Sequence, residues 1–125
     1  LTGRVVKGDQ LGRTLGFPTA NIEIDSRYKL IPAEGIYAVM VSHENYFYKG
    51  MLYIGQRPTV NGTKRVIEVN IFDFSRDIYG ENLTVYFCQW LRGDKKLNGL
   101  DELKHQLKLD RIESERILKS TTFIP

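Results

Sequence analysis

The chain has 125 residues, 42% of them hydrophobic and 26% charged, which predicts one globular domain around a single core. No apolar run approaches the roughly 20 residues that a membrane-spanning helix needs. The single cysteine, Cys88, excludes an internal disulfide and a cysteine-rich metal site. The net charge of +3 permits anionic partners without demanding nucleic acid. A cytoplasmic protein with no membrane partner is expected.

Six β-strands are predicted first, because polar and apolar residues alternate, or β-prone residues cluster, between turn-forming stretches. They are expected at Thr2–Lys7, Ala20–Ile24, Ile36–Val41, Tyr46–Ile54, Arg65–Phe74 and Leu83–Leu91. The stretch Gln56–Lys64 contains a proline and a glycine and is predicted to be a loop. Gly50 lies inside a strand and suggests a bulge or a tight barrel corner.

After Arg92 the apolar spacing changes from two to about 3.6, which predicts one amphipathic helix. Asn98 is a candidate N-cap, with Asp101 three residues later. The apolar face is expected at Leu100, Leu103, Leu107, Ile112 and Ile117. Six strands followed by one helix predict a mainly β fold, a six-stranded antiparallel Greek-key barrel with a C-terminal α-helix, because closure removes exposed sheet edges. A half-open sheet capped by the helix is the competing architecture.

The segment Gly12–Asn21, read as G-R-T-L-G-F-P-T-A-N, is the most informative stretch of the chain. Pro18 restricts the backbone, so a bend is expected to straighten into a strand with Thr19 and Asn21 projecting to one side. Neutral oxygen donors beside a glycine-rich bend suit a hydrated Mg²⁺ that carries nucleotide phosphates. Composition alone favours the other interpretation, a loop whose polar side chains satisfy its own backbone.

Glu68 places a carboxylate inside an otherwise apolar, strongly β-forming strand. It must reach water, a partner or a ligand, because burying a lone charge is costly. One interpretation is a general base at the end of a cleft. The other, which the residues alone favour, is an outward-facing glutamate on a solvated strand.

The remaining candidates are ambiguous when taken singly. Arg13 could neutralise phosphate charge, and Arg92 with the following lysines could belong to a loop that closes over a ligand. Asp73 and Tyr79 lie near a predicted turn. The two histidines, His43 and His105, are predicted to be solvated surface residues.

Five motifs occur in the order of one known family. They are G-x-V-V-x-G at 3–8, G-R-x-L-G-F-P-T-A-N at 12–21, E-V-N-I-F-D-F at 68–74, D-I-Y-G at 77–80 and L-R-G-D-K-K at 91–96. The chain resembles riboflavin kinase, and more closely the kinase module that ends the bacterial bifunctional riboflavin kinase/FAD synthetase. The resemblance covers nearly the whole chain, and its P-T-A-N segment is highly specific.

The resemblance implies transfer of the γ-phosphate of ATP to riboflavin, giving FMN and ADP, with Mg²⁺ as cofactor. It implies that Thr19 and Asn21 coordinate the metal and that Glu68 is the catalytic base. The implied nucleotide-binding residues are Gly8, Arg13, Thr19, Asn21, Asp73 and Tyr79, and the implied flavin-binding residues are Arg92, Lys95 and Leu97. The whole chain, 1–125, would be a riboflavin kinase domain, and its start at Leu1 suggests a fragment of a longer bifunctional chain with an N-terminal FMN adenylyltransferase domain.

Two positions depart from the family pattern. Asn70 stands where histidine is common, which leaves Glu68 intact but removes a titratable neighbour. Gly93 stands where proline is common, which predicts a more mobile flavin-side loop and weaker flavin affinity. Two alternatives remain at this stage: a non-catalytic barrel that binds flavin or nucleotide, and a nucleic-acid-binding barrel with stacking aromatic residues. Retention of Thr19, Asn21 and Glu68 together argues against the first.

Overall fold

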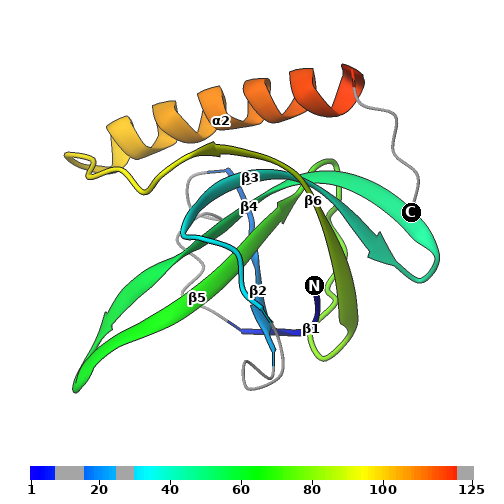
Figure 1. The fold of residues 1–125 in the computed structure, drawn as a ribbon, viewed down its shortest axis with the longest axis horizontal. Helices are drawn as coiled ribbons and strands as arrows, with labels where there is room; N and C mark the ends of the chain where they lie inside the picture. Colours follow the sequence, from blue (N-terminus) through cyan, green and yellow to red (C-terminus); the bar gives the residue numbers. More distant parts are fainter. Residues whose placement is uncertain (8–15, 25–29, 121–125) are drawn as a thin grey trace.

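The computed structural model describes residues 1–7, 16–24 and 30–120. Within them the chain forms six strands and one helix (Figure 1). These are β1 (Thr2–Val6), β2 (Ala20–Glu23), β3 (Gly35–His43), β4 (Tyr46–Thr59), β5 (Gly62–Ile71), β6 (Asn82–Arg92) and α2 (Leu100–Ser120). The predicted order of strands first and helix last is therefore confirmed.

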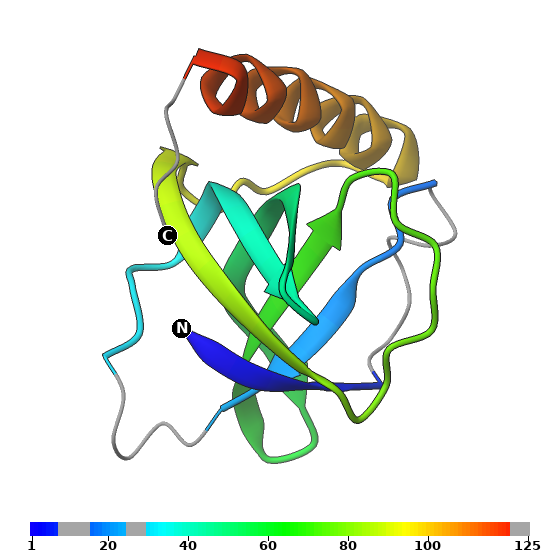
Figure 2. The ribbon, with the colours of Figure 1, turned by 90° about the vertical axis from the view of Figure 1, so that its right-hand side faces the viewer.

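The strands close into a barrel in the order β1-β2-β5-β4-β3-β6, with β6 pairing back onto β1. Every neighbouring pair is antiparallel. The short strand β1 closes the barrel, because it pairs with β2 through one half and with β6 through the other. The predicted closed barrel is therefore confirmed, and the alternative of a half-open sheet is wrong. Helix α2 lies across the outside of the barrel, against β3, β4 and β6 (Figures 1 and 2).

The core has two parts because β3 and β4 bury residues on both faces. The barrel interior is filled by aliphatic side chains, including Val39, Leu52, Ile54, Val69 and Leu83. A second cluster lies under the helix and contains Phe17, Ala38, Met51, Phe72, Ile117 and Leu118. Full burial of a side chain of this size contributes about 1.5 to 3 kcal/mol, so the second cluster fixes α2 on the barrel.

The predicted loop over Gln56–Lys64 is wrong. Strands β4 and β5 continue through it as a paired ribbon that extends beyond the barrel (Figure 1), and only residues 60–61 form the turn. Pro58 is tolerated because, among the described strands, this part of β4 pairs only with β5. On its other side the described residues place no strand that would need the missing N–H group. At its other end β5 stops at Ile71 rather than Phe74, and Asp73 has a positive φ of 57°.

Gly50 does not mark a bulge. It keeps regular register with both neighbouring strands, opposite Val39 and Ile71. A Cβ at this position would lie 2.7 Å from the Asn70 carbonyl oxygen, so glycine permits a close approach of backbones. The register shifts of the barrel occur instead between β3 and β6.

Helix α2 begins one residue later than a cap at Asn98 predicts. The Gly99 carbonyl accepts the first helical hydrogen bond, from Leu103, whereas the Asn98 N–H donates to the Glu102 carboxylate. Buried positions along the helix are Asp110, Ser114, Ile117 and Leu118. Ile112, predicted on this face, is 64% exposed because it lies off the three-to-four-residue spacing of that stripe.

His43 is also not where the sequence predicts. Its side chain is buried at the end of β3. Its Nε2 lies 2.7 Å from a Glu81 carboxylate oxygen, and the Arg76 guanidinium donates to Nδ1 at 2.9 Å. These two hydrogen bonds compensate the burial of the ring and attach the segment between β5 and β6 to the β3–β4 hairpin.

Candidate functional site

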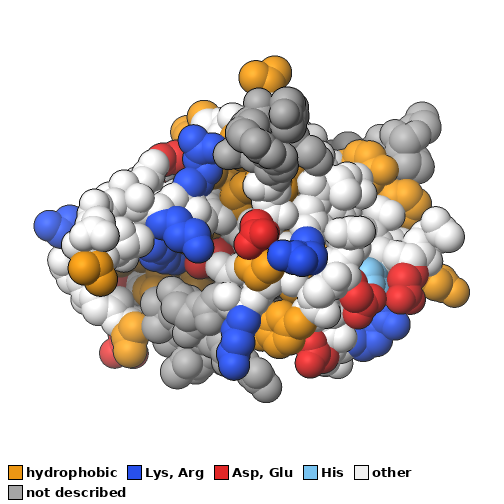
Figure 3. Space-filling view, turned by 90° about the horizontal axis from the view of Figure 1, so that it is seen from below, with side chains coloured by type: hydrophobic (Ala, Val, Ile, Leu, Met, Phe, Trp, Pro, Cys, Tyr) orange, Lys and Arg blue, Asp and Glu red, His pale blue; other side chains and the backbone are white. Residues whose placement is uncertain are grey.

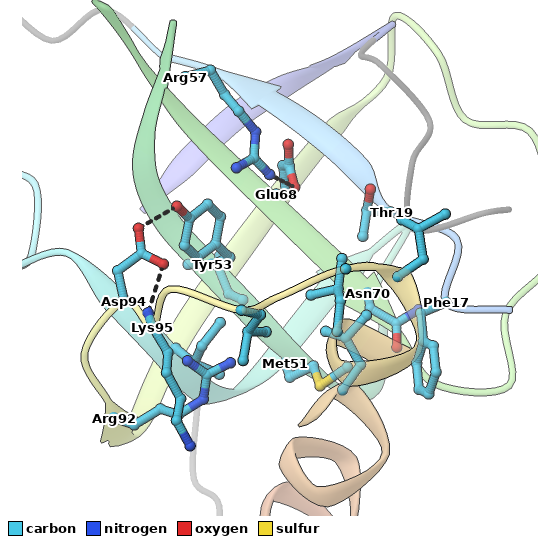
Figure 4. A pocket seen from close by; sticks show the side chains of 17 residues that line it. Phe17, Thr19, Met51, Tyr53, Arg57, Glu68, Asn70, Arg92, Asp94 and Lys95 are labelled. Atoms are coloured by element: carbon cyan, nitrogen blue, oxygen red, sulfur yellow. Dashed lines mark hydrogen bonds and ion pairs between the residues drawn. The ribbon is translucent and has the colours of Figure 1, made fainter. Parts of the chain in front are cut away.

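A cavity of about 410 Å³ lies between the barrel and the start of α2, and we call it the α2 cavity. Its walls are largely apolar, with Phe17, Met51, Leu52, Leu103 and Leu107 among them. Polar side chains enter it from several elements: Thr19, Tyr53, Arg57, Glu68, Asn70, Arg92, Asp94 and Lys95 (Figure 4). An apolar cavity with a few convergent polar groups is typical of a small-molecule site.

Glu68 points into this cavity and not into solvent. Only 9% of the residue is exposed, so the outward-facing interpretation is wrong. In the barrel it lies directly opposite Asn21 of β2 on one side and Tyr53 of β4 on the other. The alternation along β5 places it two residues from Asn70, which lines the same cavity.

Arg57 compensates the charge of Glu68. Its Nη2 lies 3.4 Å from Oε2 of the carboxylate. Arg57 was not predicted as a site residue because it falls in Gln56–Lys64, the stretch that the sequence predicts to be a loop. In a strand, side chains alternate between the two faces, so Arg57 lies on the same face as Tyr53. Tyr53 is the cross-strand partner of Glu68.

Gly55 lies between Tyr53 and Arg57 on the same face of β4. The Tyr53 ring lies over this glycine, and a Cβ there would overlap the ring and its hydroxyl. The Arg57 guanidinium carbon lies 5.1 Å from the centroid of the Tyr53 ring, a cation–π contact. Tyr53 and Gly55 therefore support the guanidinium of Arg57 beside Glu68.

The Tyr53 hydroxyl connects this support to the loop after β6. It donates to Oδ2 of Asp94 at 2.9 Å, and Oδ1 of the same carboxylate accepts the Lys95 N–H at 2.9 Å (Figure 4). Burial, the hydrogen bond to Asp94 and the charge of that carboxylate raise the pKa of Tyr53 to about 12. The phenol is therefore a hydrogen-bond donor at neutral pH.

The three predicted flavin-side residues, Arg92, Lys95 and Leu97, all line the α2 cavity. Arg92 donates from Nε and Nη2 to the two oxygens of Asp110 at 2.9 and 2.8 Å. Its guanidinium therefore ties the end of β6 to α2 as well as lining the cavity. The Lys95 ammonium donates to the Gln106 side-chain oxygen at 3.2 Å.

The predicted metal-binding pair, Thr19 and Asn21, is only partly brought together. Thr19 lines the α2 cavity, whereas Asn21 lines a hollow of about 700 Å³ that we call the ribbon cavity. Arg57 and Glu68 line both cavities and so lie between them. A hydroxyl, an amide oxygen and a nearby carboxylate are hard oxygen donors, so these residues fit a magnesium ion.

The ribbon cavity has basic walls. Lys7, Arg57, Lys64 and Arg65 line it, with Glu23 and Glu68. Seen from the side opposite α2, Lys and Arg side chains gather over the β4–β5 ribbon (Figure 3). Such a surface favours an anionic ligand.

The predicted nucleotide-binding residues that the structure describes do not share one cavity, in contrast to the predicted flavin-binding residues. Tyr79 lines a hollow of about 400 Å³, together with Thr19 and the segment after β5. Asp73 lies in the turn after β5, and its carboxylate accepts a hydrogen bond from Arg111 at 3.2 Å. Gly8 and Arg13 lie outside the described residues.

Fold and site together define a small closed β-barrel with a ligand cavity under its helix and a charge-compensated carboxylate in the wall. The sequence model of riboflavin kinase, the flavokinase family, matches residues 1–118. The chain belongs to the riboflavin kinase family. The resemblance seen in its motifs is thereby confirmed.

Individual relatives agree with this placement. The chain is 43% identical over 109 residues to a bifunctional riboflavin kinase/FMN adenylyltransferase from Haemophilus influenzae, covering 86% of this chain and 35% of that protein. A riboflavin kinase structure from Trypanosoma brucei superposes with a TM-score of 0.64 at 25% identity, covering 96% of this chain and 79% of that one. A Streptococcus pneumoniae structure described as a macrolide-efflux protein superposes with a TM-score of 0.83 at 40% identity, covering 91% and 37%.

The chain spans 35 to 38% of the length of the first curated relatives it matches. These relatives are bifunctional proteins that combine riboflavin kinase with FMN adenylyltransferase. Within residues 1–7, 16–24 and 30–120, no helix has both the length and the apolar character of a membrane span.

Proposed function

We propose that this chain is a riboflavin kinase that transfers the γ-phosphate of ATP to the 5′-hydroxyl of riboflavin, giving FMN and ADP. The observation that carries the proposal is the position of Glu68, a carboxylate enclosed in the wall of a largely apolar cavity and opposite Asn21 in the barrel. Membership of the riboflavin kinase family supports the same reaction.

In this reaction the 5′-oxygen of riboflavin forms a bond to the γ-phosphorus. The bond from that phosphorus to the β,γ-bridging oxygen breaks, and ADP leaves. Glu68 accepts the proton of the hydroxyl group as general base. Phosphoryl transfer needs mainly positioning and charge neutralisation from the protein, which a rigid barrel strand supplies.

The α2 cavity is proposed to hold the flavin. Its apolar walls suit the isoalloxazine ring, and Arg92, Lys95 and Leu97 would contact the flavin from the loop after β6. The contacts of this loop with Tyr53 and α2 would keep it over the bound ring, which excludes water from the reacting groups.

Thr19 and Asn21 would hold a Mg²⁺ ion together with nucleotide phosphate. When bound, the ion would neutralise phosphate charge. Asp73 and Tyr79 are proposed to contact the nucleotide. Gly8 and Arg13, which lie between β1 and Thr19 in the sequence, are proposed to contact it as well. We further propose that the chain is one domain of a longer cytoplasmic protein whose other domain is an FMN adenylyltransferase, so that this domain alone stops at FMN.

Conversion of riboflavin to FMN with ATP and Mg²⁺, followed by chromatography, tests the proposal. The wild-type chain is expected to form FMN, and Glu68→Gln is expected to lower the rate by about 10² to 10⁴-fold, the usual contribution of a general base. Glu113→Gln is the matched control, because Glu113 is an exposed helix residue paired with Arg116. Riboflavin binding without FMN formation would indicate the non-catalytic binding protein instead.

A further inference from the structure

Arg57 lies between the α2 cavity and the ribbon cavity and contacts the candidate base. It lines both cavities, as Glu68 does, and its Nη2 is 3.4 Å from the Glu68 carboxylate. Asn21, a candidate metal ligand, lines the ribbon cavity with them. A cation, a base and a candidate metal ligand therefore meet at the wall where a flavin hydroxyl and a nucleotide phosphate would come together.

The interaction between Arg57 and Glu68 changes when the reaction occurs. Before transfer, the guanidinium compensates the Glu68 carboxylate. When Glu68 accepts the hydroxyl proton it becomes neutral, so its attraction for the Arg57 guanidinium weakens. At that moment negative charge is spread over the equatorial oxygens of the transferring phosphoryl group. A guanidinium is well suited to these oxygens because its planar fork donates two parallel hydrogen bonds.

The structure holds Arg57 ready for this change of partner. Its side chain is 38% exposed, so it retains room to turn toward a ligand, whereas the Glu68 side chain is 11% exposed. The Tyr53 ring supports the guanidinium from one side, and Gly55 leaves the space in which that ring lies.

We propose that Arg57 is a catalytic residue that pairs with Glu68 at rest and binds the transferring phosphoryl group during the reaction. The inference rests on the proposed riboflavin kinase activity. It adds a residue that the motifs do not include, and it assigns the shared wall of the two cavities as the place of transfer.

The experiment measures FMN formation and, separately, riboflavin binding by quenching of flavin fluorescence. Arg57→Met is expected to lower kcat by about 10² to 10³-fold, the usual cost of removing one preorganised donor from a transition state, while riboflavin affinity changes less than about threefold. Arg57→Lys should recover part of the rate, because an ammonium keeps the charge but lacks the fork. The matched control is Arg116→Met, which breaks an exposed arginine–glutamate pair on α2.

Chemical rescue separates catalysis from structure. Guanidinium ion at concentrations below denaturation is expected to restore activity to Arg57→Ala and to leave Arg116→Ala unchanged. Gly55→Ala provides a second route, because displacing the Tyr53 ring should lower kcat without altering any charge. Thermal unfolding of each variant verifies that it is folded.

Three outcomes would overturn the inference: a kcat for Arg57→Met within twofold of wild type, a loss confined to riboflavin affinity, or no rescue by guanidinium. If the wild-type chain forms no FMN, the proposed function itself fails. That result is distinct from an active wild type whose Arg57 variants are equally active.

Discussion

The Asn70 amide nitrogen donates a hydrogen bond to the Pro18 carbonyl oxygen at 2.7 Å, joining β5 to the segment that carries Thr19. A carbonyl only accepts, so the amide nitrogen faces Pro18. This contact gives a structural role to Asn70, the position at which the motif resemblance leads us to expect histidine. Asn70 supplies a donor to this carbonyl, and a histidine side chain could supply one as well.

Replacement of Asn70 by leucine is therefore expected to weaken the binding of Mg²⁺. Loss of the donor frees the Pro18–Thr19 segment, so the Mg²⁺ concentration for half-maximal FMN formation should rise about tenfold, as for other residues that orient metal ligands. Asn70→His should behave like wild type, because an imidazole N–H can donate to the same carbonyl. Asn82→Leu, at the exposed start of β6, is the control. A change in riboflavin affinity at unchanged metal dependence would contradict this role.

Tyr53 is expected to make the fold sensitive to alkaline pH. Its pKa in the folded chain is about 12, against an ordinary value of 10.0. Between these values the unfolded chain loses the phenol proton and the folded chain keeps it, so stability falls as the pH rises through the window. Tyr53 is partly exposed, and solvent screening limits the expected loss to about 1 kcal/mol.

Thermal unfolding across that pH window measures this effect. Burial also raises the pKa of Tyr37, so the comparison of wild type with Tyr53→Phe isolates the contribution of Tyr53. The phenylalanine variant should lose less stability than wild type. Parallel loss in the two proteins would show that burial and the Asp94 contact do not raise the pKa of Tyr53.

His43 is expected to contribute to stability through its two partners. Replacement by alanine removes a buried ring and leaves Glu81 and Arg76 without it, which should lower the free energy of unfolding by about 1 to 3 kcal/mol. His105→Ala is the matched control, because His105 is exposed on α2. Urea unfolding of the two variants compares them directly, and equal stabilities would contradict the contribution of the buried network.

Gly93 is expected to weaken flavin binding. It follows Arg92 at the end of β6, and its carbonyl accepts a hydrogen bond from the Arg92 guanidinium at 3.1 Å. A Cβ there would meet only the Trp90 ring, at 3.8 Å, so side chains fit. Gly93→Pro should therefore reduce the freedom of the unliganded loop and raise riboflavin affinity several-fold. Equal dissociation constants for the two proteins, measured by fluorescence titration, would refute the prediction.

The sequence by itself determined the order of the strands and the helix and the alternation along β5, but not the extent of β4 and β5. The alternation along β5 placed Glu68 and Asn70 on one face, and the change of apolar period after Arg92 located the helix. Both depend on periods of two and 3.6 residues, which follow from backbone geometry alone. The order of the five motifs was sufficient to indicate the family.

Only the tertiary structure decided which of these faces is buried and which residues meet. Glu68 lies in a cavity wall because α2 and the loop after β6, both distant in sequence, cover that face of the barrel. Arg57 joins it because β4 and β5 remain paired through a stretch whose proline and glycine are typical of a loop. His43 is buried because the segment between β5 and β6 packs against it and supplies Arg76 and Glu81 as hydrogen-bond partners. Pairing between distant segments is set by the free energy of the whole packed barrel, and no local period encodes it.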